Sequence, residues 1–399
     1  MQLALPGHPH LTYCTNIHAG ESWAEIRAAL GRHLPDVKAR VSSERPMGVG
    51  LRLSAVAARE LSEPAALSEF KRFLADGGFY VFTINAFPYG SFHGERVKER
   101  VYAPDWRTPE RLAFTNLVAD LLSDLAPHGM TASISTVPGA FRAEAASRID
   151  VERIAEGFVH AAAHLHGIFR ETGRTIALAI EPEPACILET TEEAIGFFQD
   201  HLFASGACAL FSRLAGVPAS AAEASLRRHI GLCFDVCHSA VAFEDAEPTL
   251  RAIRAAGIAV AKLQLSAALS ATGAASRFER LLGRFDDGIY LHQTVERRDG
   301  RITRHTDLPD AFRAARRGDA GGEWRVHCHV PVFLDRYEEL ASTQETLREV
   351  LALCRVEEVS PHLEVETYTW NVLPEGLKSA DMAGDIVREL QWVRMELGA

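Results

Sequence analysis

Short apolar stretches alternate along the chain with longer stretches rich in Ala, Leu, Arg and Glu. The short stretches predict buried strands, and the longer ones predict helices with one apolar face. The predicted strands are Leu11–Ile17, Val49–Leu53, Tyr80–Ile84, Thr131–Thr136, Thr175–Ile180, Ile230–Val236, Val260–Leu265, Arg325–Val330 and His362–Thr367. The predicted helices are Ser22–Leu30, Ala65–Ala75, Arg111–Leu125, Val151–Thr172, Thr191–His201, Leu250–Ala256, Thr343–Leu353 and Lys378–Met395.

This alternation predicts a single α/β domain over residues 1–399, folded as a (β/α)8 TIM barrel. Because the pattern contains one strand too many for such a barrel, we expect an inserted element. The alternation stops between Leu269 and Glu323, where Ile289–Arg297 and Arg301–His305 flank an Asp299-Gly300 pair. An Asp-Gly pair between two strands is typical of a β-hairpin. We therefore predict an insertion at 270–323 that contains a hairpin and lies over the barrel mouth.

Composition narrows the choice of partners. The chain is 47 % hydrophobic with a net charge of −11, which suits a large core and disfavours nucleic-acid binding. Its seven cysteines form no C-x-x-C pair, as expected for reduced thiols in the cytoplasm. The start lacks a signal-peptide pattern, and no apolar run reaches the ~20 residues of a membrane helix. We expect a small-molecule substrate and no membrane insertion.

Four late strands end in side chains that can bind metal. One strand ends in Glu181, the next in Asp235 with His238 three residues on, and the last in Glu366. A further strand carries His327 and His329, which share a face because strand side chains alternate. Strand ends meet at the active-site face of a barrel, and carboxylates with imidazoles suit divalent metals. We predict a metal site formed by Glu181, Asp235, His329 and Glu366.

Each of these motifs also has a structural interpretation. Asp235 is a good helix N-cap, and paired strand histidines also serve as structural hydrogen-bonding groups. Glu364, two residues before Glu366, could pair with a strand arginine such as Arg52. Isolated glycines such as Gly48 and Gly50 are interpreted as turn residues rather than as a phosphate-binding loop.

Two terminal regions resemble a known group. Leu11-Thr-Tyr-Cys-Thr-Asn-Ile-His18 with Gly20-Glu-Ser-Trp23, and Val365-Glu-Thr-Tyr-Thr-Trp370, are similar to EboE proteins. That group of metabolite-traffic proteins is encoded beside a membrane prenyltransferase-like protein. It lies in the xylose-isomerase-like TIM barrel superfamily, with sugar phosphate isomerases and epimerases and AP-endonuclease-type enzymes. The resemblance runs nearly end to end, while the superfamily likeness rests on the fold pattern and a few ligands.

The superfamily binds its metal through a Glu, an Asp, a His and a final Glu at strand ends. The resemblance transfers these roles to Glu181, Asp235 and Glu366, with His238 as the accompanying imidazole. The strand containing Gln264 lacks the usual histidine. His329 is the candidate replacement, since His327-x-His329 lies where the endonuclease branch has Asp-x-His. This departure leaves open whether a metal (Mn, Mg, Co or Zn) is bound at all.

The resulting hypothesis is a metal-dependent isomerase or epimerase acting on a polyhydroxylated metabolite in a traffic pathway. Glu181 and Glu366 would serve as acid and base, His238 would orient a substrate oxygen, and the loop Ala86–Trp106 would exclude water. A non-catalytic metabolite carrier and a metal-dependent phosphoesterase are the alternatives. Pathway partner proteins and a homo-oligomer stay open. The predicted substrate-binding residues are His18, Asn16, Arg52, Glu183, Gln264, His327 and Trp370.

Overall fold

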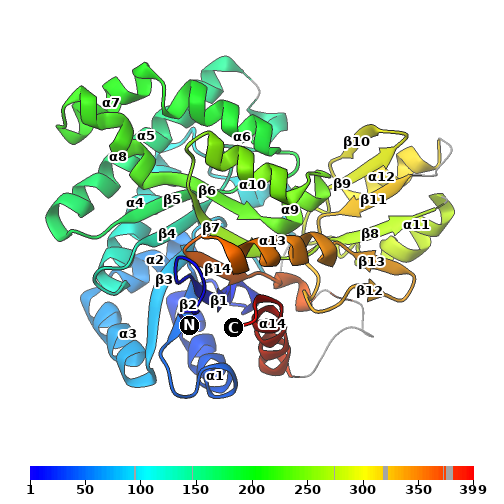
Figure 1. The fold of residues 1–399 in the computed structure, drawn as a ribbon, viewed down its shortest axis with the longest axis horizontal. Helices are drawn as coiled ribbons and strands as arrows, with labels where there is room; N and C mark the ends of the chain where they lie inside the picture. The colour runs from blue at the N-terminus through cyan, green and yellow to red at the C-terminus, as the bar shows by residue number, and fades with distance from the viewer. Residues whose placement is uncertain (94–95, 146, 274, 318–321, 372, 374–380) are drawn as a thin grey trace.

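A computed structural model of the chain shows a barrel of parallel strands surrounded by helices (Figure 1). The structure describes residues 1–399 except 94–95, 146, 274, 318–321, 372 and 374–380. Within the described residues, eight strands follow the order β1-β14-β7-β6-β5-β4-β3-β2, which confirms the predicted barrel. These strands are β1 (His10–Tyr13), β2 (Met47–Arg52), β3 (Phe79–Asn85), β4 (Ala132–Thr136), β5 (Ile176–Ile180), β6 (Ile230–Asp235), β7 (Val260–Leu265) and β14 (His362–Val365).

Closure between β1 and β2 depends on glycine. Cys14 and Gly50 form a parallel bridge, and the hydroxyl of Thr12 donates to the carbonyl of Gly48 at 2.8 Å. A Cβ atom at Gly50 would lie 1.8 Å from Oε1 of Glu364 and 2.7 Å from the carbonyl oxygen of Tyr13. Both glycines lie inside β2, so their interpretation as turn residues was wrong. The backbone of β2 lies too close to Glu364 here for any side chain to fit at Gly50.

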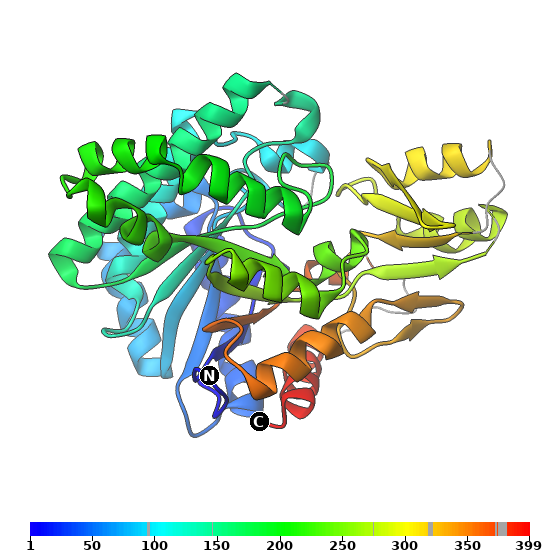
Figure 2. The same cartoon turned by 45° about the horizontal axis from the view of Figure 1, so that its top comes forward.

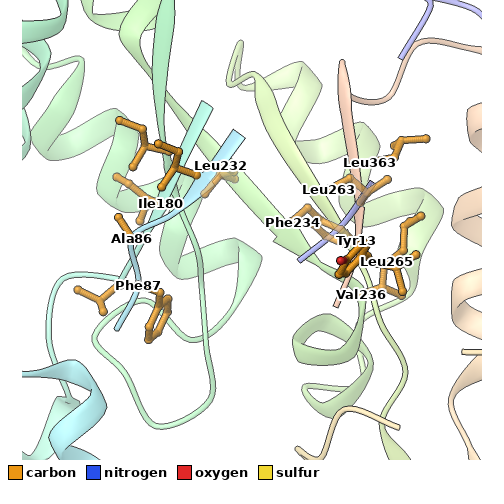
Figure 3. Packing of buried hydrophobic residues seen from close by; sticks show 14 of the residues in the cluster. Tyr13, Ala86, Phe87, Ile180, Leu232, Phe234, Val236, Leu263, Leu265 and Leu363 are labelled. Atoms are coloured by element: carbon orange, nitrogen blue, oxygen red, sulfur yellow. The ribbon is translucent and has the colours of Figure 1, made fainter. Parts of the chain in front are cut away.

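The barrel interior contains a buried ion pair between charged residues of two strands. Nζ of Lys262 lies 2.5 Å from Oε2 of Glu364, and both side chains are fully buried. The expected pairing of Glu364 with Arg52 was wrong, because Gly50, two residues before Arg52, faces Glu364. Arg52 lies nearer the mouth and binds Glu21 at 2.8 Å. Apolar residues between the strands and helices form the main core, part of which Figure 3 shows.

Helices cover the outside of the barrel. Several begin at polar caps, such as Ser22 and Ser147, each in a reciprocal capping box. The predicted helix Lys378–Met395 corresponds to α14, although positions 378–380 lie outside the described residues. None of the helices in the described part of the chain has both the length and the apolarity to cross a membrane. The helices around the barrel are α1 (Trp23–Val41), α2 (Ala55–Leu61), α3 (Pro64–Gly77), α4 (Pro109–Leu125), α5 (Arg148–Thr172), α6 (Thr191–Phe197), α7 (Ser205–Ala215), α8 (Ala219–His229), α9 (Val236–Val241), α10 (Ala246–Ala255), α13 (Gln344–Val356) and α14 (Met382–Leu397).

A second, antiparallel sheet is inserted between β7 and β14 and projects to one side of the barrel (Figure 2). Its strand order is β10-β9-β11-β8-β13-β12, and α11 (Ala275–Leu282) and α12 (Leu308–Ala315) belong to the same insertion. The predicted hairpin is present, with Asp299 and Gly300 both at positive φ. The strands are β8 (Leu269–Thr272), β9 (Thr294–Arg298), β10 (Arg301–His305), β11 (Glu323–Val326), β12 (Arg336–Tyr337) and β13 (Leu340–Ser342).

This inserted sheet corrects two expectations. It extends from Leu269 to Ser342, well beyond the predicted 270–323. The predicted ninth strand, Arg325–Val330, overlaps β11, which pairs antiparallel with β8 and β9. His327 and His329 therefore lie beyond the end of a strand of the inserted sheet, and not at the end of a barrel strand. The local apolar pattern of β11 carried no information on which sheet it joins.

Replacing Gly50 with Ala tests the close approach at the barrel seam. We expect a loss of about 1–3 kcal/mol in the free energy of unfolding, because Glu364 and the Tyr13 backbone must move. Urea denaturation monitored by circular dichroism measures the loss. Gly167→Ala is the matched control, since no atom lies within 4 Å of its added Cβ and helical alanine is favoured. Equal stability of the Gly50 variant and wild type would contradict this account.

His229 makes stability depend on pH. Burial lowers the pKa of His229 from 6.5 to about 4, and its Nδ1 donates to the carbonyl of Ile176 at 2.8 Å. At pH values between 4 and 6.5 the unfolded chain therefore binds a proton at His229 that the folded protein does not bind. The free energy of unfolding falls as the pH falls through this range, because protonation favours the unfolded chain. The destabilisation caused by His229→Gln should shrink by about 1–2 kcal/mol between pH 7 and pH 5.

Urea titrations of wild type and variant at both pH values measure that change. Leu226→Ala is the control, because this residue of α8 is fully buried but carries no titrating group. Its destabilisation should be equal at the two pH values. A His229→Gln effect that is also independent of pH would contradict the assigned proton linkage.

Candidate metal centre

Buried carboxylates meet where three barrel strands end. Glu181 directly follows β5, Asp235 is the last residue of β6, and Glu366 directly follows β14. One carboxylate oxygen from each of the three lies within 4.8 Å of the others. The barrel thus brings together three of the four predicted ligands. The fourth, His329, joins a second group in which Asp235 and His238 are the partners.

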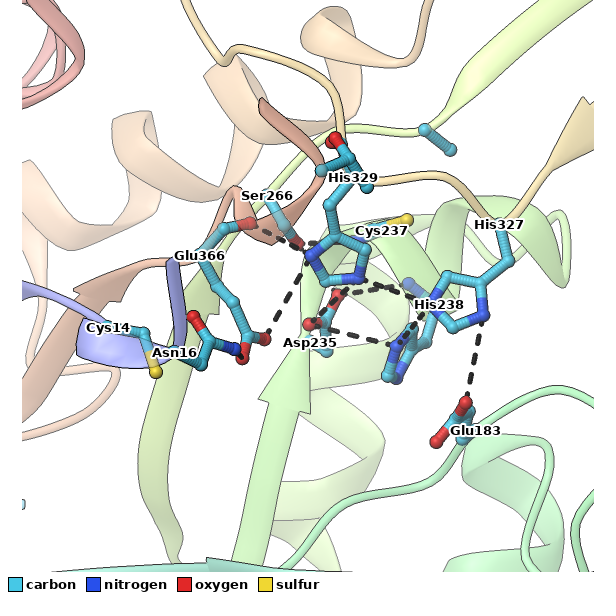
Figure 4. Close-up of polar contacts among 12 residues, drawn as sticks. Cys14, Asn16, Glu183, Asp235, Cys237, His238, Ser266, His327, His329 and Glu366 are labelled. Carbon is cyan, nitrogen blue, oxygen red and sulfur yellow. Dashed lines mark hydrogen bonds and ion pairs between the residues drawn. The ribbon is translucent and has the colours of Figure 1, made fainter. Parts of the chain in front are cut away.

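Three imidazoles converge beside these carboxylates, as Figure 4 shows. Nε2 of His327 lies 3.1 Å from Nε2 of His238 and 3.2 Å from Nε2 of His329. Oδ2 of Asp235 lies 3.8 Å from Nε2 of both His238 and His329. All four side chains are buried. The predicted substrate-binding residue His327 is therefore at the centre of the histidine cluster.

The other nitrogen of each ring determines its tautomer. Nδ1 of His238 lies 2.8 Å from the carbonyl oxygen of Pro182, and Nδ1 of His329 lies 2.8 Å from that of Glu366. A carbonyl oxygen can only accept, so both Nδ1 atoms carry the hydrogen. Nδ1 of His327 donates to Oε1 of Gln293 at 2.8 Å, and the amide nitrogen of Gln293 donates elsewhere. When the rings are neutral, each of the three Nε2 atoms therefore carries a lone pair and no hydrogen.

Three lone pairs directed at one another repel, and a cation between them would relieve that repulsion. Protons are a poor solution, because burial lowers the pKa of His238 to about 4 and that of His327 well below its usual value. A tetrahedral Zn²⁺ with Zn–N bonds of about 2.0–2.1 Å separates its ligand atoms by roughly 3.3 Å, close to the observed spacings. Imidazole nitrogens with one carboxylate oxygen form a donor set that zinc and similar ions accept. The residues fit a metal.

Asp235 links the histidines to the carboxylates. Its Oδ1 accepts hydrogen bonds from the hydroxyl of Ser266 at 2.7 Å and the backbone N–H of His238 at 3.1 Å. Asp235 is thus the N-cap of α9, while Oδ2 remains without a hydrogen-bond partner among the described residues. Burial alone would raise its pKa, but the imidazoles of His238 and His329 hold the pKa below its usual value. Oδ1 of the carboxylate thus caps the helix, while Oδ2 is available to a metal ion.

Glu181 and Glu366 differ in their hydrogen bonding. Burial raises the pKa of Glu181 well above its usual range, and the charges of Glu366 and Asp235 raise it further. The pKa of Glu366 is raised by burial and by Asp235. Oε1 of Glu366 accepts hydrogen bonds from Asn16 at 2.7 Å and Asn85 at 3.0 Å, whereas Oε2 of Glu181 has no partner among the described residues. Only Glu366 has amide donors that stabilise its charged form.

A cavity opens above these groups and encloses about 540 Å³ of unfilled space, part of it open to solvent. Its floor contains Glu181, Glu183, Glu366 and the three histidines. Glu183 accepts a hydrogen bond from the hydroxyl of Tyr102 at 2.6 Å, and burial raises its pKa to about 8. The remaining lining residues are Asn16, Asn85, Phe87, Pro88, Phe92, Val97, Lys98, Val101, Tyr102, Tyr290, Leu291 and Tyr368.

Some predicted substrate-binding residues lie elsewhere. Asn16, Glu183 and His327 line the cavity, but the described lining does not include the other four. His18 stacks on His33 with ring centroids 4.3 Å apart. The guanidinium of Arg52 donates hydrogen bonds to Glu21 and to two carbonyl groups. Gln264 is fully buried inside the barrel. Trp370 packs near Phe333. A substrate role for these four stays a prediction.

Sequence reasoning missed several groups that shape the site. Gln293 orients His327, Tyr102 holds Glu183, and Tyr290 and Tyr368 form walls of the cavity. These residues come from the inserted sheet and from mouth loops, so no strand-end pattern marks them. The aromatic content of the segment 86–106 was the one available signal. Of its residues, Phe92 lines the cavity, whereas Tyr89 packs on Phe114.

Comparison with known proteins identifies no family, since no family model and no curated protein matches the sequence. Matching solved structures include the IOLI protein with a bound zinc atom (12% identity, TM-score 0.48, covering 98% of each chain). Another is a xylose isomerase-like TIM barrel protein from Mycobacterium smegmatis in complex with magnesium (12% identity, TM-score 0.48, 99% of this chain and 97% of that one). A third is the probable 3-DHS dehydratase AsbF from Bacillus anthracis (11% identity, TM-score 0.46, 96% and 97%).

These likenesses are too distant to assign a function, and the EboE resemblance receives no support from them. The metal centre therefore depends on the chain's own geometry.

Removing one imidazole tests the metal centre. We expect His327→Ala to bind zinc at least roughly 100-fold more weakly than wild type, because changes to groups that merely orient a ligand already cost 10–100-fold. Elemental analysis after dialysis against zinc, followed by chelator competition, measures the affinity. His166→Ala is the control, because His166 is buried in α5 away from the cluster. Unchanged zinc content in the His327 variant would refute the site.

Proposed function

We propose that the protein is a metal-dependent isomerase or epimerase of a polyhydroxylated small molecule. The observation that supports it most directly is the set of inward-facing Nε2 lone pairs of His238, His327 and His329 beside the carboxyl groups of Glu181 and Glu366. These groups lie at the base of a cavity that is partly open to solvent. The histidines supply a cation site, and the two glutamates supply a proton-transfer pair.

In this proposal the metal is held by the three histidines and Asp235, which leaves Glu181 and Glu366 for proton transfer. A bound divalent cation polarises a carbonyl and its neighbouring hydroxyl and so acidifies the adjacent C–H bond. The carbonyl groups of Pro182 and Glu366 and the amide of Gln293 keep each imidazole in the tautomer that a cation requires. This division of roles differs from the prediction that the two glutamates are also ligands.

Glu366 is the better base of the pair. Asn16 and Asn85 donate to its Oε1 and stabilise the carboxylate, so Oε2 is free to take a proton from carbon. Glu181 is the better acid, because no amide donor among the described residues stabilises its charged form and its Oε2 can give a proton to the substrate. Each turnover moves one proton from substrate to Glu366 and one from Glu181 to substrate, and proton exchange with solvent then restores both carboxyl groups. The aromatic cavity walls limit competing water.

Two other functions stay as candidates. The apolar walls of the cavity also suit a carrier that binds and releases a metabolite without chemistry, in line with the EboE resemblance and its metabolite-traffic role. A phosphoesterase would use the same metal, and hydrolysis of an aryl phosphate by the metal-loaded protein would reveal it. A cytoplasmic location, pathway partners and a homo-oligomer stay predictions.

Hydrogen exchange tests the proposed chemistry without knowledge of the product. Metal-loaded protein in D₂O should incorporate deuterium at the carbon next to the carbonyl of a ketose or keto-cyclitol, detected by NMR. We expect Glu366→Gln to reduce this exchange by about 10²–10⁴-fold, because the base is lost, while zinc content stays unchanged.

Glu244→Gln is the matched control, since this carboxyl is largely buried but binds Thr191 away from the cavity. It should exchange at the wild-type rate. Exchange that survives in the Glu366 variant would overturn its assignment as base. Tight ligand binding with no exchange in wild type would favour the carrier.

A further inference from the structure

The walls of the cavity expose carbon rather than polar atoms. The rings of Phe92, Tyr290 and Tyr368 pack as a triangle, with centroids 5.1, 5.3 and 5.2 Å apart. The hydroxyl of Tyr290 donates to the carbonyl of Phe92 at 3.0 Å, so the polar end of that ring is already used. Tyr368 also packs on His329, at 4.8 Å between centroids. This triangle is an apolar surface directly beside the candidate metal ligands.

Positive charge for an anionic group is absent from the described lining apart from Lys98. Its ammonium group lies 2.6 Å from Oδ2 of Asp307 and 3.9 Å from Oδ1 of Asp286, so two carboxylates already neutralise it. The cavity floor adds the carboxyl groups of Glu181 and Glu366. Proteins bind phosphate with free Arg or Lys side chains or with helix N-termini. Apart from the proposed metal ion, whose charge Asp235 partly offsets, a phosphate group would meet only carboxyl groups here.

The floor instead offers polar groups that lack partners. Oε2 of Glu181 and Oδ1 of Asn16 both line the cavity, are buried and have no hydrogen-bond partner within the described protein. The amide oxygen of Asn16 can only accept, while Oε2 of Glu181 donates when it is protonated and accepts otherwise. Buried acceptors of this kind are costly unless a ligand satisfies them. Hydroxyl groups donate to such acceptors and can also approach a cation through their oxygen. A ligand with hydroxyls on one side and carbon on the other matches both surfaces.

We infer that this site, if it has the proposed function, takes an uncharged hydroxylated compound bearing a flat apolar or aromatic group, and no phosphate ester. The hydroxyl groups face Glu181, Asn16 and the metal-binding histidines. The apolar group lies against Phe92, Tyr290 and Tyr368. The inference thus names the substrate class of the proposed isomerase.

Three ligands that share one sugar ring test this preference. Isothermal titration of zinc-loaded protein compares phenyl β-glucoside, methyl β-glucoside and glucose 6-phosphate. Phenyl glucoside should bind about tenfold more tightly than methyl glucoside, as expected when a ring stacks on aromatic side chains. Glucose 6-phosphate should bind most weakly.

Variants of the triangle show whether it causes the preference. Phe92→Leu and Tyr290→Leu keep an apolar wall but remove the ring faces, and should reduce the advantage of phenyl over methyl glucoside to less than about threefold. Binding of methyl glucoside should weaken much less than binding of phenyl glucoside. Tyr89→Leu is the matched control, because Tyr89 comes from the same loop but packs on Phe114 outside the cavity.

Several results would overturn the inference. These are tightest binding of glucose 6-phosphate, equal binding of the two glucosides, an advantage that survives in both variants, or no binding of any ligand by zinc-loaded protein. Zinc content is measured on the same samples. Failure to hold zinc contradicts the proposed function itself, whereas preference for phosphate by zinc-loaded protein contradicts only the substrate class.

Discussion

The candidate metal centre depends on three hydrogen bonds that point away from it. Nδ1 of His238 donates to a carbonyl group of the β5 loop, Nδ1 of His329 donates to the carbonyl of Glu366, and Nδ1 of His327 donates to an amide oxygen of the inserted sheet. Each bond fixes a tautomer and leaves the opposite nitrogen as a lone pair. A cation between these lone pairs would relieve their mutual repulsion. The orienting oxygens therefore matter as much as the ligands.

Two parts of the fold share the site. The barrel provides Glu181, Asp235 and Glu366 at the ends of β5, β6 and β14, as parallel strand ends usually do. The inserted sheet provides His327 and His329 from the chain that leaves β11. In the strand of the barrel where the resemblance expects a histidine, Ser266 follows β7 and orients Asp235 instead. His329 and His327 lie beside Asp235 and His238 instead, and both come from outside the barrel.

The sequence predicts the eight barrel strands well, because a buried parallel strand is a short apolar run whatever its neighbours are. It does not predict membership of a sheet, so β11 was counted among the barrel candidates although its partners are β8 and β9. It predicts that Glu364 needs a counter-charge, yet Lys262 rather than Arg52 provides it, because register is set by pairing across the barrel. The ligands at strand ends were visible as apolar runs followed by acids. Gln293 and Tyr290 were not, since they come from an irregular part of the insertion.

The sharing of the histidines between barrel and inserted sheet has a consequence for cooperativity. A cation held by His238 of α9 and by His327 and His329 acts as a cross-link between two elements that each have their own hydrogen-bonded sheet. Such a ligand stabilises only the arrangement in which both elements are docked, by RT ln(1 + [L]/Kd). A bound cation would therefore resist separation of the inserted sheet from the barrel, in addition to the apolar core that the two already share.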